Sequence, residues 1–194
     1  MNLSKFASYE DCIELQIPTD LEQLKQVNFR WHQYNPRKNI RRFGCSITSL
    51  DGQDSGIPDL DSILEYNRQH GTNYSEKDFK IPTIHASPFN YFLSKFHVGR
   101  SHYIKLESGG FFPWHRDADH ETFRIIYTIE NCNSNNLIWL EDDRILRLDS
   151  NRWYYINTKK KHCLFALDTC IFTVFNVLDI DNNIRQLGNH MIIR

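Results

Sequence analysis

The sequence lacks the features by which several classes of protein are recognised. No stretch approaches the roughly 20 consecutive apolar residues that a membrane-spanning helix needs, and the N-terminal segment carries charges throughout, unlike a secretory leader. The five cysteines form no C-x-x-C pair, and their odd number fits a reduced chain rather than a disulfide framework. We therefore expect a cytoplasmic protein that makes no contact with a membrane.

Charge of one sign is also lacking. The formal net charge is −1, and the basic runs "NPRKNIRR" and "KKKH" are too short to form a nucleic-acid footprint. No repeat or low-complexity segment interrupts the 194 residues, of which 40% are hydrophobic and 13% aromatic. These values predict one folded domain spanning residues 1–194, with no nucleic-acid partner.

The pattern of the sequence changes near residue 97. Residues 1–96 carry helix signals at 18–33, 57–71 and 87–96, with one strand followed by a turn at 41–56. Residues 97–180 form a core of short strand candidates separated by turns, and we expect the tail, 181–194, to add a hairpin or edge strand. The eight strand candidates are "SHYIKLE", "FFPWHRD", "TFRIIYTIE", "NLIWLED", "RILRLD", "RWYYINT", "HCLFAL" and "CIFTVFNVL". This order predicts a mainly β, α+β protein in which N-terminal helices flank a sandwich or jelly roll.

Two residues in "FFPWHRD" are candidate metal ligands. On a strand, residues i and i+2 point to the same side, so His115 and Asp117 would aim an imidazole and a carboxylate at one spot. His162, which opens the strand candidate "HCLFAL", is the best placed third ligand, and two histidines with one carboxylate form a facial triad. A set built on His115 and His120 is the alternative, although a spacing of five suits neither a strand face nor a helix face.

Arg124 interrupts the apolar run "TFRIIYTIE" and allows three interpretations. If the face with Phe123 and Ile125 packs on the helices, Arg124 points into the barrel, where a buried guanidinium needs an anion such as a carboxylate. If the faces are reversed, Arg124 lies in water. In the third interpretation Arg124 forms a structural ion pair with Glu107 or Asp117.

Taken together, these residues resemble the iron(II)/2-oxoglutarate-dependent dioxygenases, nearest to their aspartyl/asparaginyl β-hydroxylase-like branch. The likeness covers about residues 97–180 and includes the lead-in "YIKLESGGFFPWHRD" and the segment "WYYINTKKKHCLFALDTCIFTVFNV". It implies a cupin-like double-stranded β-helix in which His115, Asp117 and His162 bind iron(II). It also implies that Arg124, nine residues after the first metal histidine, holds the distal carboxylate of 2-oxoglutarate.

The sequence departs from that branch at two places. The branch commonly has a second basic residue about ten positions after the distal histidine, where this chain has Phe172 and Thr173, so Thr173 is the candidate substitute. Conversely, the animal members of the branch lack the carboxylate ligand, whereas Asp117 is present here.

The resemblance implies an enzyme that uses O2 and 2-oxoglutarate to hydroxylate an amino acid or a peptide or protein side chain, with release of succinate and CO2. Arg41 or Arg42 could contact an acidic group of the substrate, or could belong to a solvated loop. Two other functions compete. One is a cupin-type barrel that holds a metal or a small ligand without oxygenase activity, and the other is a partner-binding module with incidental histidines.

Overall fold

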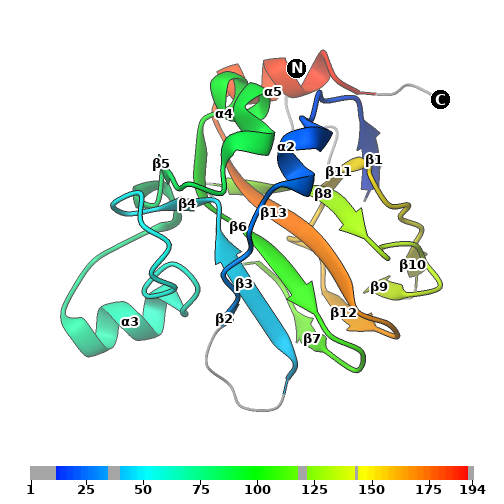
Figure 1. Ribbon diagram of the computed structural model, residues 1–194, viewed down its shortest axis with the longest axis horizontal. Coiled ribbons are helices and arrows are strands. Elements are labelled where there is room, and N and C mark those ends of the chain that lie inside the picture. Colours follow the sequence, from blue (N-terminus) through cyan, green and yellow to red (C-terminus); the bar gives the residue numbers. More distant parts are fainter. Residues whose placement is uncertain (1–11, 35–39, 118–121, 143, 192–194) are drawn as a thin grey trace.

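Two antiparallel sheets face each other in the computed structural model, which describes residues 12–34, 40–117, 122–142 and 144–191 (Figure 1). The major sheet has seven strands, in the order β1 (Cys12–Leu15), β11 (Trp153–Ile156), β8 (Thr122–Glu130), β13 (Cys170–Leu178), β6 (Val98–Leu106), β3 (Arg42–Ser46) and β2 (His32–Gln33). The minor sheet has the order β10 (Arg144–Leu146), β9 (Leu137–Glu141), β12 (His162–Ala166) and β7 (Phe111–His115). A short pair joins β4 (Thr48–Ser49) to β5 (Ile81–Pro82).

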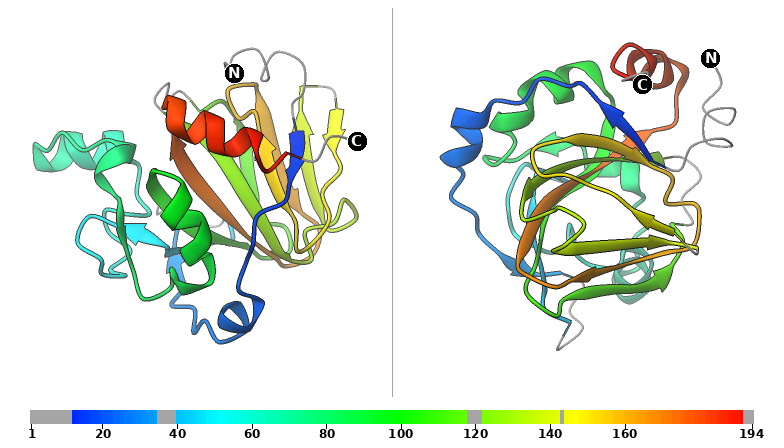
Figure 2. Two further views of the ribbon diagram at one scale, coloured as in Figure 1. Left: turned by 90° about the horizontal axis from the view of Figure 1, so that it is seen from above. Right: turned by 90° about the vertical axis from the view of Figure 1, so that its right-hand side faces the viewer.

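This architecture is a double-stranded β-helix, or jelly roll, and the eight strand candidates after residue 97 are confirmed as β6 to β13. The right-hand view in Figure 2 shows the two sheets closing around a common interior. The helical elements are α2 (Leu21–Lys25), α3 (Ile63–His70), α4 (Asn90–Lys95) and α5 (Asp181–Gly188), with 3-10 turns η1 (Glu76–Asp78) and η2 (Ser87–Phe89).

Strand β8 shows why the major sheet has a hydrophobic core on each side. Phe123, Ile125 and Tyr127 belong to an outer core that also contains Phe89 and other helix residues. Ile126 belongs to an inner core between the sheets. Successive strand residues point to opposite faces, so this division confirms that the even-numbered face of β8 looks into the barrel.

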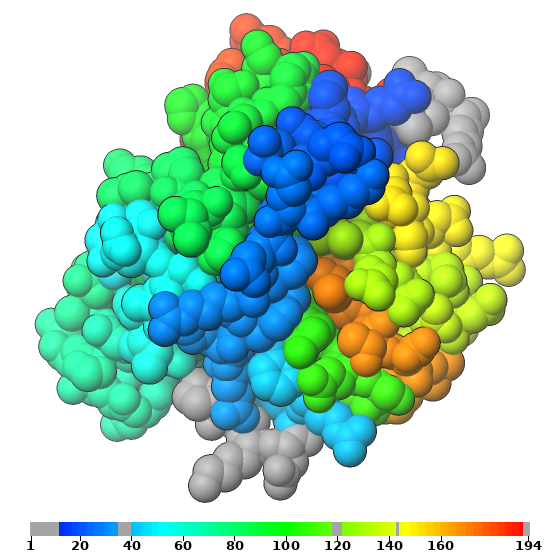
Figure 3. Space-filling view, viewed as in Figure 1, coloured from blue at the N-terminus to red at the C-terminus, as the bar shows by residue number. Residues whose placement is uncertain are grey.

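The outer core is built mainly from aromatic rings. The ring of Phe89 meets those of Phe175, Tyr127 and Trp153 edge to face, with centroids 5.0 to 5.7 Å apart, a favoured geometry for aromatic pairs. Helices α2, α4 and α5 gather over this face in Figure 1. Figure 3 shows the N-terminal segment, coloured blue, lying across the front of the molecule between the α3 segment and the minor-sheet strands.

The helix predicted over 18–33 is short in the structure. Asp20 caps α2 by accepting a hydrogen bond from the Gln23 backbone N–H at 3.0 Å, but the helix ends at Lys25. Beyond it, Val27, Phe29 and Trp31 pack against the outer core. Residues two apart lie on the same face of an extended chain. An extended conformation therefore lets all three apolar side chains reach the outer core, which a helix would not.

Two further segments differ from the prediction. Gly71, in the left-handed region at φ 66°, ends α3 as predicted, yet α3 buries none of its residues and Leu64 is 84% exposed. The tail forms α5 instead of a hairpin, because Ile184 and Leu187 pack on the outer core three residues apart. Among the described residues, no helix combines the length and apolar character of a membrane-crossing segment.

Candidate metal centre

Two histidines meet where the minor sheet pairs β7 with β12. His115 ends β7, His162 begins β12, and the register makes them direct partners, with ring centroids 4.2 Å apart. The Nδ1 of His115 lies 2.7 Å from the Pro113 carbonyl oxygen, and that of His162 lies 2.9 Å from the Lys160 carbonyl oxygen. Because a carbonyl only accepts, each Nδ1 must carry the proton. A neutral ring then presents its Nε2 lone pair, the form in which histidine binds metals.

Asp117 supplies the third group, although it lies two residues beyond the end of β7 and not on the strand. Its backbone N–H donates to the Thr158 carbonyl oxygen at 3.0 Å, and its carboxylate lies 3.9 Å from His115 Nε2. The ligand atoms of His115, Asp117 and His162 all lie within 4.8 Å of one another. The structure thus brings together the three residues that the sequence singled out.

The surroundings favour the protonation states that a metal ion requires. Burial by itself would raise the pKa of Asp117, but the charge of Arg124 and a hydrogen bond from the Thr158 side chain lower that pKa below its ordinary value. Burial lowers the pKa of His162. Asp117 is therefore ionised and His162 neutral, as metal binding demands.

Arg124 lies on the inner face of β8 and is only 8% exposed, so the interpretation that places it in water is wrong. Its Nε lies 3.0 Å from Asp117 Oδ2, and its Nη1 donates to the Thr122 hydroxyl at 2.6 Å. Of the two acidic partners named in the third interpretation, Arg124 thus pairs with Asp117. The other, Glu107, pairs with Lys105 at 3.2 Å. Its role as a cosubstrate anchor stays a prediction.

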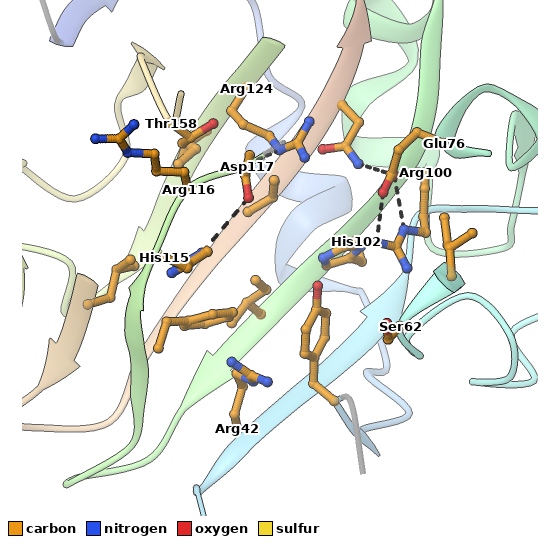
Figure 4. Close-up of a pocket in the computed structure, with 18 of the residues that line it drawn as sticks. Arg42, Ser62, Glu76, Arg100, His102, His115, Arg116, Asp117, Arg124 and Thr158 are labelled. Carbon is orange, nitrogen blue, oxygen red and sulfur yellow. Dashed lines mark hydrogen bonds and ion pairs between the residues drawn. The ribbon is translucent and has the colours of Figure 1, made fainter. Parts of the chain in front are cut away.

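A cavity of about 770 Å³ extends from these residues across the interior. Figure 4 shows His115, Asp117 and Arg124 on one side of it and Arg100 with Glu76 on the other, with His102 between them. The volume falls within the range of about 300–1,000 Å³ that is usual for small-molecule sites. One end of the cavity therefore holds the candidate metal ligands, and the second end, next to Arg100 and Glu76, has room for another molecule.

The second end is organised around Arg100, on β6. Its guanidinium makes a two-point ion pair with Glu76 of η1, at 2.9 and 3.0 Å, and donates to the backbone carbonyl oxygens of Asp61 and Asp59. The Asn176 amide also donates to Glu76. Since buried charges are stable only when paired and hydrogen-bonded, this network fixes the wall formed by residues 59–78.

Asp59 makes this wall sensitive to pH. Its side chain is buried beside the Ser46 hydroxyl, and burial raises its pKa to about 6. A carboxyl group with a raised folded-state pKa binds its proton more tightly in the folded chain, so stability falls as pH rises from about 4 to 6 and is constant above. We expect Asp59→Asn to remove this fall, on the order of 2 kcal/mol, as measured by urea denaturation at pH 4.5 and 7.5. Equal pH dependence in both proteins would contradict the expectation, and Asp179→Asn, at an exposed carboxylate that is not among the charges acting on Asp59, is the matched control.

The structure separates Thr173 from the candidate site. Its hydroxyl accepts from the Tyr127 N–H at 3.0 Å and donates to the Tyr127 carbonyl at 3.3 Å, on the side away from the cavity. The cavity is instead lined by its strand neighbours Phe172, Val174 and Asn176. Strand alternation already implies this division, and Asn176 lies directly opposite Arg124 in the sheet register.

The other candidates named from the sequence have different positions. Arg41 donates to the Ser108 carbonyl oxygen at 2.7 Å and stands among loop residues. Arg42 lines the cavity, where its guanidinium lies 4.1 Å from the Phe112 ring centroid. His120 lies outside the described residues, so its pairing with His115 stays a prediction.

Sequence reasoning did not identify several residues of the cavity wall, among them Tyr34, Arg100 and His102. Arg100 and His102 share the inner face of β6, and Tyr34 packs against His102 with ring centroids 5.0 Å apart. Burial, with the charges of the neighbouring arginines, lowers the pKa of His102 well below its usual value, so the ring is neutral. Arg100, like Arg124, is an arginine on the inner face of a strand. It was overlooked because the predicted strand "SHYIKLE" began one residue after it.

No protein-family model matches the chain, and no curated protein matches it either. Solved structures do. A Trichoplax adhaerens prolyl hydroxylase, in complex with a peptide fragment of hypoxia inducible factor, is 12% identical over 93% of this chain and 89% of its own, with a TM-score of 0.48. A Burkholderia pseudomallei oxidoreductase of the 2OG-Fe(II) oxygenase family is 10% identical over 84% and 79%, with a TM-score of 0.46.

Cupins are matched as well. A cupin-2 domain protein from Shewanella frigidimarina is 15% identical over 63% of this chain and 99% of its own, with a TM-score of 0.34. Each TM-score is below 0.5, so these likenesses carry no argument about chemistry, and the fold rests on the sheet topology. The aspartyl/asparaginyl β-hydroxylase-like branch stays a prediction.

Proposed function

We propose that this chain is an iron(II)- and 2-oxoglutarate-dependent oxygenase that hydroxylates an amino acid or a peptide or protein side chain. One observation carries the proposal. His115, Asp117 and His162 converge at one end of an interior cavity, with the buried Arg124 3.0 Å from Asp117. A metal site and a cation for a carboxylate ligand are thus next to each other.

The donor set fits iron(II). Two imidazole nitrogens and one carboxylate, all reaching the ion from one side, leave positions open on the other. When bound, iron(II) supplies the oxidation, in which 2-oxoglutarate and O2 give succinate and CO2 and one oxygen atom enters the substrate as a hydroxyl group. The hydrogen bonds from Nδ1 of both histidines hold their rings in the metal-binding tautomer.

Arg124 is the residue we assign to 2-oxoglutarate. A guanidinium has five N–H donors, so Arg124 can keep its bonds to Asp117 and Thr122 while its remaining donors bind a second carboxylate. The low exposure of the side chain shields such a pair from water. Phe172 and Val174, on the neighbouring strand, would contact the apolar methylene groups of the same ligand.

The substrate would occupy the second end of the cavity. That end is lined by side chains of both charge signs, including the basic Arg42 and the acidic Glu76 and Asp61, which suits a substrate carrying an amine and a carboxylate. Tyr34 and Ile63 add apolar surface. This mixture supports an amino acid or a peptide segment as the substrate class.

The test is an anaerobic titration of the metal-free protein with iron(II) and then 2-oxoglutarate, followed by visible absorption. We expect a weak metal-to-ligand charge-transfer band that needs both additions, and succinate formation once O2 and a substrate are supplied. Binding of the metal with no band and no succinate would contradict the proposal and favour the cupin-type barrel. If the metal does not bind either, the histidines are incidental to function.

A further inference from the structure

A second group of metal-ligating side chains lies outside the cavity. Cys45 on β3, Asp54 in the following loop and His85 before η2 place their ligand atoms within 4.8 Å of one another. Asp54 Oδ2 is 3.1 Å from His85 Nε2, and Asp54 Oδ1 is 3.5 Å from the Nε2 of His32, on β2. The ligand atoms of Cys45, Asp54 and His85 thus form a compact group, and the His32 ring contacts the other oxygen of the same carboxylate.

We propose that Cys45, Asp54 and His85 bind a structural zinc ion. One thiolate, one imidazole and one carboxylate supply three positions of a tetrahedron, and His32, whose Nε2 lies 3.5 Å from Asp54, is the residue we assign to the fourth. Ligands at ordinary zinc distances stand about 3.3–3.6 Å apart on such a tetrahedron, so a modest contraction of the observed cluster would seat the ion. The soft thiolate selects against magnesium and calcium.

The surroundings hold these side chains in place before any ion is bound. The Tyr103 hydroxyl donates to the His85 carbonyl oxygen at 2.8 Å, and the His85 N–H donates to the Thr83 hydroxyl. Gly56, at φ +80°, lets the loop close over His32, because a Cβ there would come within 2.7 Å of the imidazole ring. Preorganisation of this kind is typical of sites whose ligands must keep a fixed geometry.

Burial argues against a different use of the same groups. Cys45 is 0% exposed and His85 5%, so a cysteine–histidine–aspartate triad here could not reach a substrate. The Nε2 of His32 is buried and makes no hydrogen bond within the described part of the chain, and its contact with Asp54 Oδ1 is an ion pair at 3.5 Å. An ion would use that nitrogen and would displace the proton of the Cys45 thiol to the buffer.

The position of the cluster explains what the ion would do. Cys45 belongs to the outer core, so its thiol lies on the face of the major sheet opposite to the cavity. The loop that contains Asp54 leads into residues 59–61, whose carbonyl oxygens hold Arg100. This part of the chain has little regular structure, and a metal ion is an effective way to fix such a segment.

The experiment uses cobalt(II) as a probe in the full-length protein. We expect about one equivalent of zinc to copurify, and cobalt(II) added to the metal-free protein to give a thiolate-to-metal charge-transfer band in the near ultraviolet. Cys45→Ser should remove the band and lower the zinc content at least tenfold, while Cys170→Ser, at a buried thiol in the inner core, should change neither. His85→Gln is a second variant with the same expectation.

The result is independent of the oxygenase proposal, because His115, Asp117 and His162 include no sulfur and cannot produce that band. Wild-type protein that gives no thiolate band overturns the inference, whatever the variants do. A band that persists unchanged in Cys45→Ser would overturn it too, since the sulfur would then belong to another cysteine.

Discussion

Replacing His115 with alanine is expected to abolish iron(II) binding and, with it, the formation of succinate. The two remaining ligands, Asp117 and His162, leave four of the six positions of the ion without a protein ligand, too many for it to be held firmly. Because the bound metal carries the oxidation, we expect turnover to fall by about 10³-fold or more. Calorimetric titration with iron(II) under anaerobic conditions and a succinate assay measure the two effects.

The same variant should fold normally. The His115 side chain is about one-third exposed and ends its strand, so its removal leaves no large cavity in either core. His70→Ala is the matched control: His70 is an exposed histidine on α3 that stacks on Tyr66, and its loss should change neither iron binding nor turnover. Stoichiometric iron(II) binding by the His115 variant would remove His115 from the metal site.

Arg124→Met is expected to weaken 2-oxoglutarate binding by about 2–5 kcal/mol, which is the usual cost of truncating one partner of a buried charge pair. Methionine keeps most of the side-chain volume but removes all donors. The loss should appear as a higher dissociation constant for 2-oxoglutarate in the iron(II)-loaded protein, with iron affinity changed much less.

The ion pair between Arg124 and Asp117 makes a control ligand necessary, because the arginine could act through the metal ligand. 2-Oxobutanoate has the same keto-acid end and no distal carboxylate, so it should bind the variant and the wild type equally if Arg124 holds that carboxylate. An equal loss for both acids would show that Arg124 positions Asp117 instead. Arg124→Lys should recover part of the affinity, since it restores the charge but not the two-point geometry.

The strands were predictable because their alternation is strong and local. In β8, large apolar residues at odd positions and Arg124 at an even one identified both the strand and its inward face, and the structure agrees. The short helix α2 shows the limit of such reasoning. The spacing of Leu24 and Val27 is compatible with a helix. The spacing of Val27, Phe29 and Trp31 is equally compatible with an extended chain, and only the position of the outer core decides between the two conformations.

The candidate metal centre was predictable for a similar reason: its two histidines lie at strand ends that pair directly, as the register of His115 with His162 shows, and Asp117 follows two residues after β7. The far wall of the cavity was not. Glu76 and Asn176 are 100 positions apart in the chain and meet only through the docking of η1 on β6. Gly99 permits that docking, because a Cβ there would overlap the Glu76 carbonyl, a requirement that no periodicity reveals.

Helix α3 contributes to the cavity wall yet buries none of its own residues, and Figure 1 shows it standing apart from both sheets. The inner and outer cores therefore do not depend on its side chains, whereas His115, His162 and Arg124 lie on strands of the two sheets that enclose the inner core. A change in the sequence or length of α3 should thus reshape one wall of the cavity at little cost to the stability of the barrel.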